Sequence, residues 1–313
     1  SQQCRTEKGG GMKGIDLANN DNIIIQNVEI TGFRWGIHGS FHWGKTTIRK
    51  SVVHDQATEH GIYSPANSYN NVQYEQEDIT VEDSLLYRNR RTGYQNNGPA
   101  KRLKLIGNII HSNAGAGITF TRGVQNSEVI GNLIFNNNHH GIVIWDDGSV
   151  GSRQSNDNNK FINNIIWHGS SWNGVCLDGG DVDNNKWVAC SHKDSPASMH
   201  AIVFGDSAGK FVFKGNTFKK NIFRTVNVPV FGTSDLSDIQ NSIIQDNSFY
   251  RADENPLNGL LSAKWAKDGE TDETHDHKEC DPCRYYWTLE KMQNHPVWKQ
   301  IIKNNNIANP LQQ

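Results

Sequence analysis

The chain has 313 residues, and 31 Lys and Arg against 33 Asp and Glu give it a formal net charge of −2. This balance argues against a general nucleic-acid binder, which needs a basic excess. A mean hydropathy of −0.67, with no long apolar run, predicts no membrane-spanning helix. Only 35% of the residues are hydrophobic, but 9 Trp and 12 Phe argue against a disordered polymer. We therefore expect an ordered chain with a thin, elongated core.

The beginning of the chain shows no recognisable signal peptide, and a start at Ser1 fits a mature end left by cleavage as well as an arbitrary boundary. We expect residues 1–13 to cap the N-terminal end of the fold, because the repeats begin after them. The five Cys are an odd number, so at least one is free, pairs with another chain or binds a metal.

Two columns of similar residues recur along the chain. The first is an apolar residue after Gly or Ala, at spacings of 25, 32, 24, 24, 33 and 27 residues: Ile37, Ile62, Tyr94, Ile118, Ile142, Val175 and Ile202. The second is mostly polar, at spacings of 24, 32, 25, 24, 32, 26, 26 and 31 residues: Asn27, Ser51, Asp83, Asn108, Asn132, Asn164, Cys190, Asn216 and Asn247. The long steps fall in the same repeats in both columns, which chance rarely produces.

Each repeat contains three short apolar segments separated by Asn- and Gly-rich turns. Apolar residues alternate within each segment, as they do in β-strands. Three strands in a period near 24 residues predict an all-β fold, a three-sheet right-handed parallel β-helix, over residues 14–250. In such a coil the Asn side chains of the second column would stack and satisfy one another's hydrogen bonds.

This pattern resembles the pectate-lyase-like superfamily of parallel β-helices, and the resemblance rests on the Gly-Ile and Asn columns. The resemblance is specific for the fold only, because the superfamily includes lyases, hydrolases, epimerases, phage tailspikes and adhesins. In the superfamily's enzymes the substrate commonly lies along one parallel sheet, between loops from the flanking turns. Two insertions, at residues 65–78 and 148–159, are placed to form such walls.

Because the Ile anchors point inward, the next residue of each strand is expected to face outward. The first outward column is then His38, Tyr63, Gln95, Thr119, Val143, Cys176 and Val203, and the second is Ser40, Pro65, Asn97, Thr121, Trp145, Asp178 and Gly205. A basic turn precedes these strands and a mostly acidic turn follows them. We expect the following residues to bind a sugar chain, the first by stacking its indole on a ring: Trp145, Gln95, Asn97, Thr121, His140 and Arg91.

Elimination is one chemistry that fits this face. His38 and Tyr63 are neighbours in the first outward column and can act as base and acid of a β-elimination, while Arg122 would neutralise a uronate carboxylate. An outward His and Tyr are also ordinary surface residues of a sheet. The signature motifs of the Ca²⁺-dependent pectate lyases and of the mannuronan epimerases are absent.

Hydrolysis is the second chemistry that fits this face. Asp146, Asp147 and Asp178 are predicted at the ends of adjacent strands, and paired carboxylates are what glycoside hydrolysis requires. Asp178 and Asp181 would also suit Ca²⁺, which prefers oxygen ligands. The simpler interpretation is turn chemistry, since Asp beside Gly is common after a strand. The likeness to polygalacturonases is loose, because their His-containing and Arg-Ile-Lys motifs are not found in the expected places.

Residues 251–313 break the period, and we expect an irregular, partly helical tail that packs on the end or one face of the coil. Within it, residues 287–293 predict a short amphipathic helix. The spacing of His275, His277, Cys280 and Cys283 is one that Zn²⁺ can use, but a disulfide fits these cysteines at least as well.

Taken together, these features predict a secreted or cell-surface monomer that acts on an acidic polysaccharide. The basic edge and the His38–Tyr63 pair favour elimination over hydrolysis. A non-catalytic β-helix that binds glycans or serves as a rigid rod is the alternative from a different class.

Overall fold

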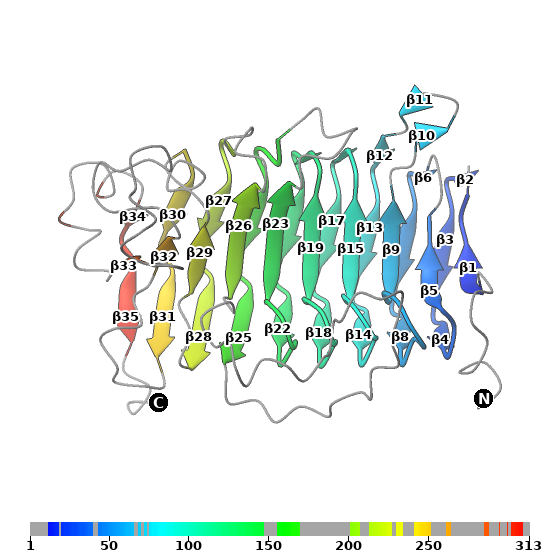
Figure 1. Ribbon diagram of the computed structural model, residues 1–313, viewed down its shortest axis with the longest axis horizontal. Coiled ribbons are helices and arrows are strands. Elements are labelled where there is room, and N and C mark those ends of the chain that lie inside the picture. Colours follow the sequence, from blue (N-terminus) through cyan, green and yellow to red (C-terminus); the bar gives the residue numbers. More distant parts are fainter. Residues whose placement is uncertain are drawn as a thin grey trace, which may run out of the picture.

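A computed structural model shows the chain as short strands wound into an elongated coil (Figure 1). The residues that the structure describes are 12–18, 20–39, 43–65, 68–69, 72–73, 75–146, 155–169, 201–206, 213–226, 230–233, 241–251, 261–263, 285–287, 294, 299 and 302–308. Nearly all of them belong to strands or to the tight turns between strands.

Four sheets, which we name A to D in the order in which the chain meets them, run along the coil. Sheet A contains β1 (Lys13–Asp16), β5 (Trp35–His38), β9 (Ile62–Pro65), β15 (Tyr94–Asn97), β19 (Ile118–Thr121), β23 (Ile142–Asp146), β26 (Ile202–Asp206), β29 (Phe231–Thr233), β32 (Leu261–Ala263) and β33 (Tyr285–Trp287). The short sheet B contains β2 (Asn20–Asp21), β6 (Trp43–Gly44), β12 (Gln76–Glu77), β16 (Ala100–Lys101) and β20 (Val124–Gln125).

Sheets C and D complete each coil. Sheet C contains β3 (Ile24–Gln26), β7 (Thr47–Arg49), β13 (Thr80–Glu82), β17 (Lys104–Ile106), β21 (Glu128–Ile130), β24 (Lys160–Ile162), β27 (Thr217–Lys219), β30 (Ile243–Gln245) and β34 (Ile302–Lys303). Sheet D contains β4 (Glu29–Thr31), β8 (Val52–His54), β14 (Leu85–Tyr87), β18 (Ile109–His111), β22 (Leu133–Phe135), β25 (Ile165–Gly169), β28 (Ile222–Val226), β31 (Ser248–Arg251) and β35 (Asn306–Ala308). The predicted three-sheet parallel coil is confirmed, with short sheet B added at one corner.

The strand pairs within the four sheets are parallel, except that β33 pairs antiparallel with β32. A separate antiparallel pair, β10 (Ser68–Tyr69) and β11 (Val72–Gln73), lies in the insertion that was predicted as a wall after β9. Figure 1 shows this pair projecting beyond the coil, near β12.

The turn between sheets C and D explains the Asn column. Its first residue has a positive φ, as at Asp83 (48°) and Gly131 (65°), and the next side chain points into the coil. Asn108 donates from Nδ2 to Oδ1 of Asn132 at 3.0 Å, and Asn132 donates in the same way to Asn164 at 3.0 Å. Eight residues form this ladder: Ser51, Ser84, Asn108, Asn132, Asn164, Asn221, Asn247 and Asn305. Stacked amides therefore satisfy polar groups that the coil buries.

The ladder corrects part of the predicted polar column. Asn27 and Asp83 occupy the positive-φ position, one residue before the ladder. Asn164 bonds directly to Asn221, so neither Cys190 nor Asn216 lies between them. Asn216 instead belongs to a second ladder, where it accepts from the backbone N–H of Asn159 at 3.0 Å. The period alone could not detect this shift, because both turns place an Asn at a similar spacing.

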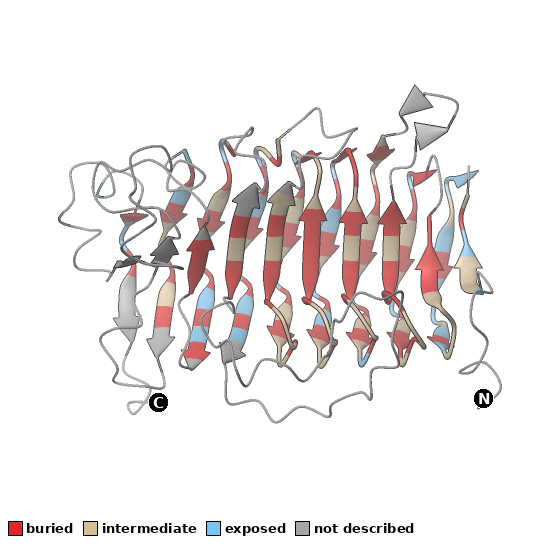
Figure 2. Ribbon diagram, in the orientation of Figure 1, coloured by how far each residue is buried: buried red, intermediate tan, exposed pale blue. Residues whose placement is uncertain are grey.

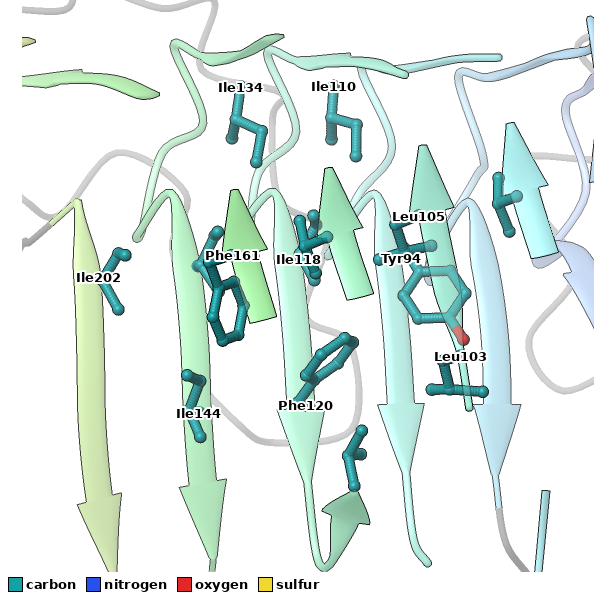
Figure 3. Close-up of a cluster of buried hydrophobic side chains, with 14 of the residues drawn as sticks. Tyr94, Leu103, Leu105, Ile110, Ile118, Phe120, Ile134, Ile144, Phe161 and Ile202 are labelled. Carbon is teal, nitrogen blue, oxygen red and sulfur yellow. The ribbon is translucent and has the colours of Figure 1, made fainter. Parts of the chain in front are cut away.

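The core fills the coil between the sheets. Phe120 and Phe161 lie inside it with ring centroids 6.2 Å apart, and Figure 3 shows both rings between the strands. Phe161 stacks on Phe218 at 4.8 Å, so one large ring sits above another in successive coils. On the outside, β25 and β28 alternate between exposed and buried positions, as a half-buried strand should (Figure 2).

The regular sheets extend past the predicted boundary at residue 250. Strand β34 pairs with β30, and β35 pairs with β31, so part of the expected tail continues sheets C and D. The helix predicted over residues 287–293 lies outside the described residues, apart from Trp287, which ends β33. Within the described part of the chain, no helix combines the length and apolarity needed to cross a membrane.

Candidate functional site

The register of sheet A places the predicted outward residues in one line. His38 pairs with Tyr63, Tyr63 with Gln95, and Gln95 with Thr119. The next column brings Asn97 beside Thr121 and Thr121 beside Trp145. Neighbouring coils of a parallel sheet lie about 4.8 Å apart, so side chains from distant parts of the sequence can act together here.

A chain of hydrogen bonds crosses three of these strands. Asn97 donates from Nδ2 to the Tyr63 hydroxyl at 2.9 Å, and Thr121 donates from Oγ1 to Oδ1 of Asn97 at 3.0 Å. The same Thr121 hydroxyl proton is shared with the backbone oxygen of Asn96, which lies 2.8 Å from Oγ1. Tyr63, Asn97 and Thr121 are all half-buried, so their orientation is fixed while part of each side chain stays accessible.

Three aromatic rings surround Tyr63. The His60 ring stacks on it at 4.9 Å, the His38 ring lies 5.5 Å away at a tilt, and Trp35 stacks at 6.5 Å. The Arg34 guanidinium lies 4.2 Å from the centre of the Trp35 ring. The sequence favoured a packing role for Trp35, and the structure shows that it packs against the candidate site.

His38 lies in the predicted column but is not an ordinary surface residue, because it is only 6% exposed. Burial lowers the pKa of His38 to about 4, with Lys13 acting in the same direction and Asp16 against it. Nδ1 lies 3.7 Å from Oδ1 of Asp16. His38 is therefore a neutral imidazole at neutral pH.

His60 is neutral as well, and its tautomer follows from geometry. The backbone N–H of Thr92 donates to Nδ1 at 3.2 Å, so the ring proton is on Nε2, which lies 3.5 Å from Oε2 of Glu59. Burial lowers the pKa of His60 well below its ordinary value, and Arg91 acts in the same direction. The ring is therefore a fixed, uncharged support for Tyr63.

The basic edge of the site is organised around Glu59, which the sequence reasoning missed. Oε2 of this buried carboxylate lies 3.2 Å from Nε of Arg91, and Oε1 lies 3.6 Å from Nη2 of Arg34. The only sequence signal was an acidic residue beside His60 in the turn before the Gly-Ile pair.

Arg122 follows β19 directly and has a φ of 64°. Its backbone N–H donates to the oxygen of Trp145 at 3.1 Å. Burial raises the pKa of the Tyr63 hydroxyl, against the influence of Asn97, Arg122 and Arg91. Tyr63 therefore keeps its proton at neutral pH.

The remaining predicted binding residues spread over the adjacent coils. Gln95 and Trp145 are half-buried in the two outward columns, and His140 is buried at the basic edge, with its ring 4.7 Å from that of His139. Trp145 lies three coils beyond Pro65, or about 14 Å from it at the spacing of a parallel sheet.

Of the four aspartates predicted to act in hydrolysis or to bind Ca²⁺, the structure describes only Asp146. Asp146 ends β23 and pairs with Asp206 of β26, whereas Asp147, Asp178 and Asp181 lie outside the described residues. Val143 pairs directly with Val203, so the prediction that Cys176 and Asp178 occupy a coil between β23 and β26 is wrong.

Neither metal prediction falls on described residues. The suggested Ca²⁺ ligands Asp178 and Asp181, and the suggested Zn²⁺ ligands His275, His277, Cys280 and Cys283, all lie outside them. Among the residues that the structure does describe, no group of three or more His, Cys, Asp or Glu side chains is arranged to hold a metal ion.

The fold is a right-handed parallel β-helix. Residues 4–166, more than half of the chain, match the family model described as "Right handed beta helix region". The chain belongs to this family. No curated protein sequence matches it.

Solved structures share the fold at low identity. The A-module of mannuronan C-5 epimerase AlgE4 from Azotobacter vinelandii matches with a TM-score of 0.52 and 14% identity over 91% of this chain and 60% of that one. The AlgE6 A-module from the same organism gives 0.53 and 13% over 93% and 65%. Pectate lyase Pel9A gives 0.47 and 13% over 72% and 49%. The chain thus spans less than two thirds of each of these proteins.

Proposed function

We propose that the protein is a secreted carbohydrate-active enzyme that cleaves an acidic polysaccharide by β-elimination on the outer face of sheet A. The observation that carries this proposal is the environment of Tyr63. Its hydroxyl accepts a hydrogen bond from Asn97, its ring stacks on neutral His60, and neutral His38 lies beside it.

The reaction needs three groups. A base removes the proton on the carbon next to the uronate carboxylate, a cation stabilises the negative charge that develops there, and an acid protonates the leaving glycosidic oxygen. The C–H electron pair becomes the new double bond as the bond to the leaving oxygen breaks. Elimination thus requires no water and no second carboxylate.

The residues of the site match these roles. His38 has a pKa of about 4, so at neutral pH its imidazole is unprotonated and can serve as a weak base. Tyr63 has a raised pKa and keeps the proton that the leaving oxygen needs. Arg91 and Arg122 supply positive charge to bind the carboxylate, and an arginine guanidinium suits a planar anion.

The rest of the sheet A face is suited to a sugar chain. Gln95, Asn97 and Thr121 offer polar groups, and Trp145 offers an indole on which a sugar ring can stack. We assign His140, at the basic edge, to the same binding surface. The two solved epimerase modules are named for mannuronan, a polymer of uronic acid, which supports an acidic polysaccharide as the substrate class.

Hydrolysis is the second candidate, because β23 and β26 place Asp146 beside Asp206. Glycoside hydrolysis uses a pair of carboxylates, so this backbone register is the observation that favours it. In this alternative Asp147 and Asp178 would also act as catalytic carboxyl groups, with or without Ca²⁺ bound at Asp178 and Asp181. A monomer that only binds glycans is the remaining candidate.

Incubation of the purified protein with polymannuronate, polygalacturonate and a neutral glucan tests the proposal. We expect new reducing ends and ultraviolet absorbance from an unsaturated product to rise together with at least one polyuronate. Reducing ends without absorbance would support hydrolysis. Neither signal, with no inversion at C-5 seen by NMR, would contradict an enzymatic function on these polymers.

Variants separate the two mechanisms. Under elimination, Tyr63→Phe and Arg122→Ala should lose turnover while Asp178→Asn retains it, and hydrolysis predicts the reverse. Tyr87→Phe, on sheet D, is the matched control for loss of a tyrosine hydroxyl.

A further inference from the structure

Glu59 is a buried carboxylate for which the elimination chemistry gives no direct role. It precedes His60 in the turn into β9 and is 6% exposed. Its two oxygens face Arg91 at 3.2 Å, Arg34 at 3.6 Å and Nε2 of His60 at 3.5 Å. A buried carboxylate is costly unless cations and hydrogen-bond donors surround it, so these contacts fix its position.

Arg91 is attached to Glu59 at two points. The backbone N–H of Arg91 donates to the backbone oxygen of Glu59 at 3.2 Å, and the Nε group faces the carboxylate at the same distance. The Arg91 side chain is still 37% exposed. Because Nε is the guanidinium nitrogen that meets Glu59, the two Nη groups remain available for a second planar anion.

The same carboxylate is coupled to Tyr63. Nε2 of His60 faces Glu59, and the His60 ring stacks on Tyr63 at 4.9 Å. The backbone N–H of Thr92, next to Arg91, donates to the other nitrogen of His60. Glu59 therefore fixes an arginine and the ring that supports the catalytic tyrosine.

We propose that Glu59 is a positioning residue that holds Arg91 by Nε so that its Nη groups bind the carboxylate of the substrate beside Tyr63. This inference rests on the proposed action on polyuronates and adds the residue that sets their orientation. It concerns Arg91, whose guanidinium faces a buried anion.

The test compares Glu59→Gln, Arg91→Ala and the double variant. Turnover kinetics are measured with the polyuronate that the wild type cleaves, and dissociation constants are measured in the Tyr63→Phe background with oligomannuronate and oligogalacturonate. Each single variant should raise Kd about tenfold, the effect of losing about 1.4 kcal/mol of binding, and should lower kcat/KM by at least the same factor. The double variant should be no worse than Arg91→Ala. Glu77→Gln on sheet B, which removes one of the two carboxylates that pair with Arg102, is the matched control.

The outcomes are separable. If the wild type neither binds nor cleaves any polyuronate, the proposed function fails. The wild type could be active while Glu59→Gln binds oligouronate as tightly as the protein with Glu59 intact. That result, or additive losses of affinity in the double variant, would overturn the positioning role and leave the proposed function standing. Should Glu59→Gln not fold, Glu59→Asp keeps the charge and shortens the side chain by one methylene. It should then weaken oligouronate binding, and an unchanged Kd would contradict the proposal.

Discussion

The Tyr63 hydroxyl accepts a hydrogen bond from Nδ2 of Asn97 at 2.9 Å, from the next coil of sheet A and 34 positions along the sequence. A hydroxyl that accepts from one side can direct its own proton elsewhere. Thr121 Oγ1 lies 3.0 Å from Oδ1 at the other end of the Asn97 amide. A Tyr63 hydroxyl that accepts from Asn97 keeps its own proton for another acceptor.

Tyr63→Phe should therefore lower kcat by about 100-fold or more, the usual effect of losing a general acid. The ring contacts with His60 and Trp35 would remain, and the loss of one hydrogen bond should cost only about 1 kcal/mol of stability. Steady-state kinetics with urea denaturation tests both statements. Unchanged turnover in this variant would remove Tyr63 from the mechanism.

Acid should destabilise the protein through its buried histidines. The pKa of His38 falls from 6.5 in an exposed chain to about 4 in the folded one. Between these values the unfolded chain binds a proton that the folded chain does not, so stability is lost as the pH falls from 6.5 through 4. Burial lowers the pKa of His60 in the same direction.

Urea denaturation midpoints measured across that pH range provide the test. We expect His38→Gln to show a shallower loss of stability than the wild type. Elimination should persist in mildly acid solution and fall only as the pH approaches 4. An equally steep loss of stability in the variant would show that His38 is not buried as a neutral ring.

The columns of the coil could be predicted from the sequence because each coil repeats the same inward and outward positions. This put His38, Tyr63 and Gln95 in one line, as the register shows. Glu59 could not be predicted in the same way. Its role depends on Arg34 and Arg91, which belong to neighbouring coils and share no sequence motif with it.

The repeat pattern also led to a wrong prediction, where a segment of the sequence resembles a repeat. Gly174-Val175-Cys176 has the spacing of a sheet A strand, yet β23 pairs directly with β26. A period identifies candidates for a strand but does not show which neighbours they join. For the same reason the ladder positions were displaced by one residue at Asn27 and Asp83, since both turn positions accept a short polar side chain.

Asn132→Leu should destabilise the coil by about 3 kcal/mol or more. Asn132 donates to the oxygen of Leu105 at 2.8 Å and to Asn164 at 3.0 Å, and it accepts from the backbone N–H of Asn108 at 2.9 Å. Each buried partner left unsatisfied costs about 1–3 kcal/mol. In the control Gln26→Leu, an exposed amide is lost, and stability should change by less than about 0.5 kcal/mol. Equal effects of the two substitutions would contradict the ladder.

Phe218→Ala should cost about 3–5 kcal/mol, because this fully buried ring stacks on Phe161 at 4.8 Å and meets Phe204 and Phe231 edge-on. Phe218→Leu refills part of the space and should cost clearly less. Chemical denaturation of both variants gives the comparison. A loss within about 1 kcal/mol for Phe218→Ala would mean that the core is not continuous between these coils.

The central claim is that Tyr63 on sheet A protonates the leaving oxygen in an elimination. The most direct measurement follows unsaturated product and reducing ends together during digestion of a polyuronate by the wild type, Tyr63→Phe and Tyr87→Phe. We predict that both signals rise in parallel with the wild type and with Tyr87→Phe and are lost with Tyr63→Phe. Reducing ends without unsaturated product, or full activity of Tyr63→Phe, would contradict it.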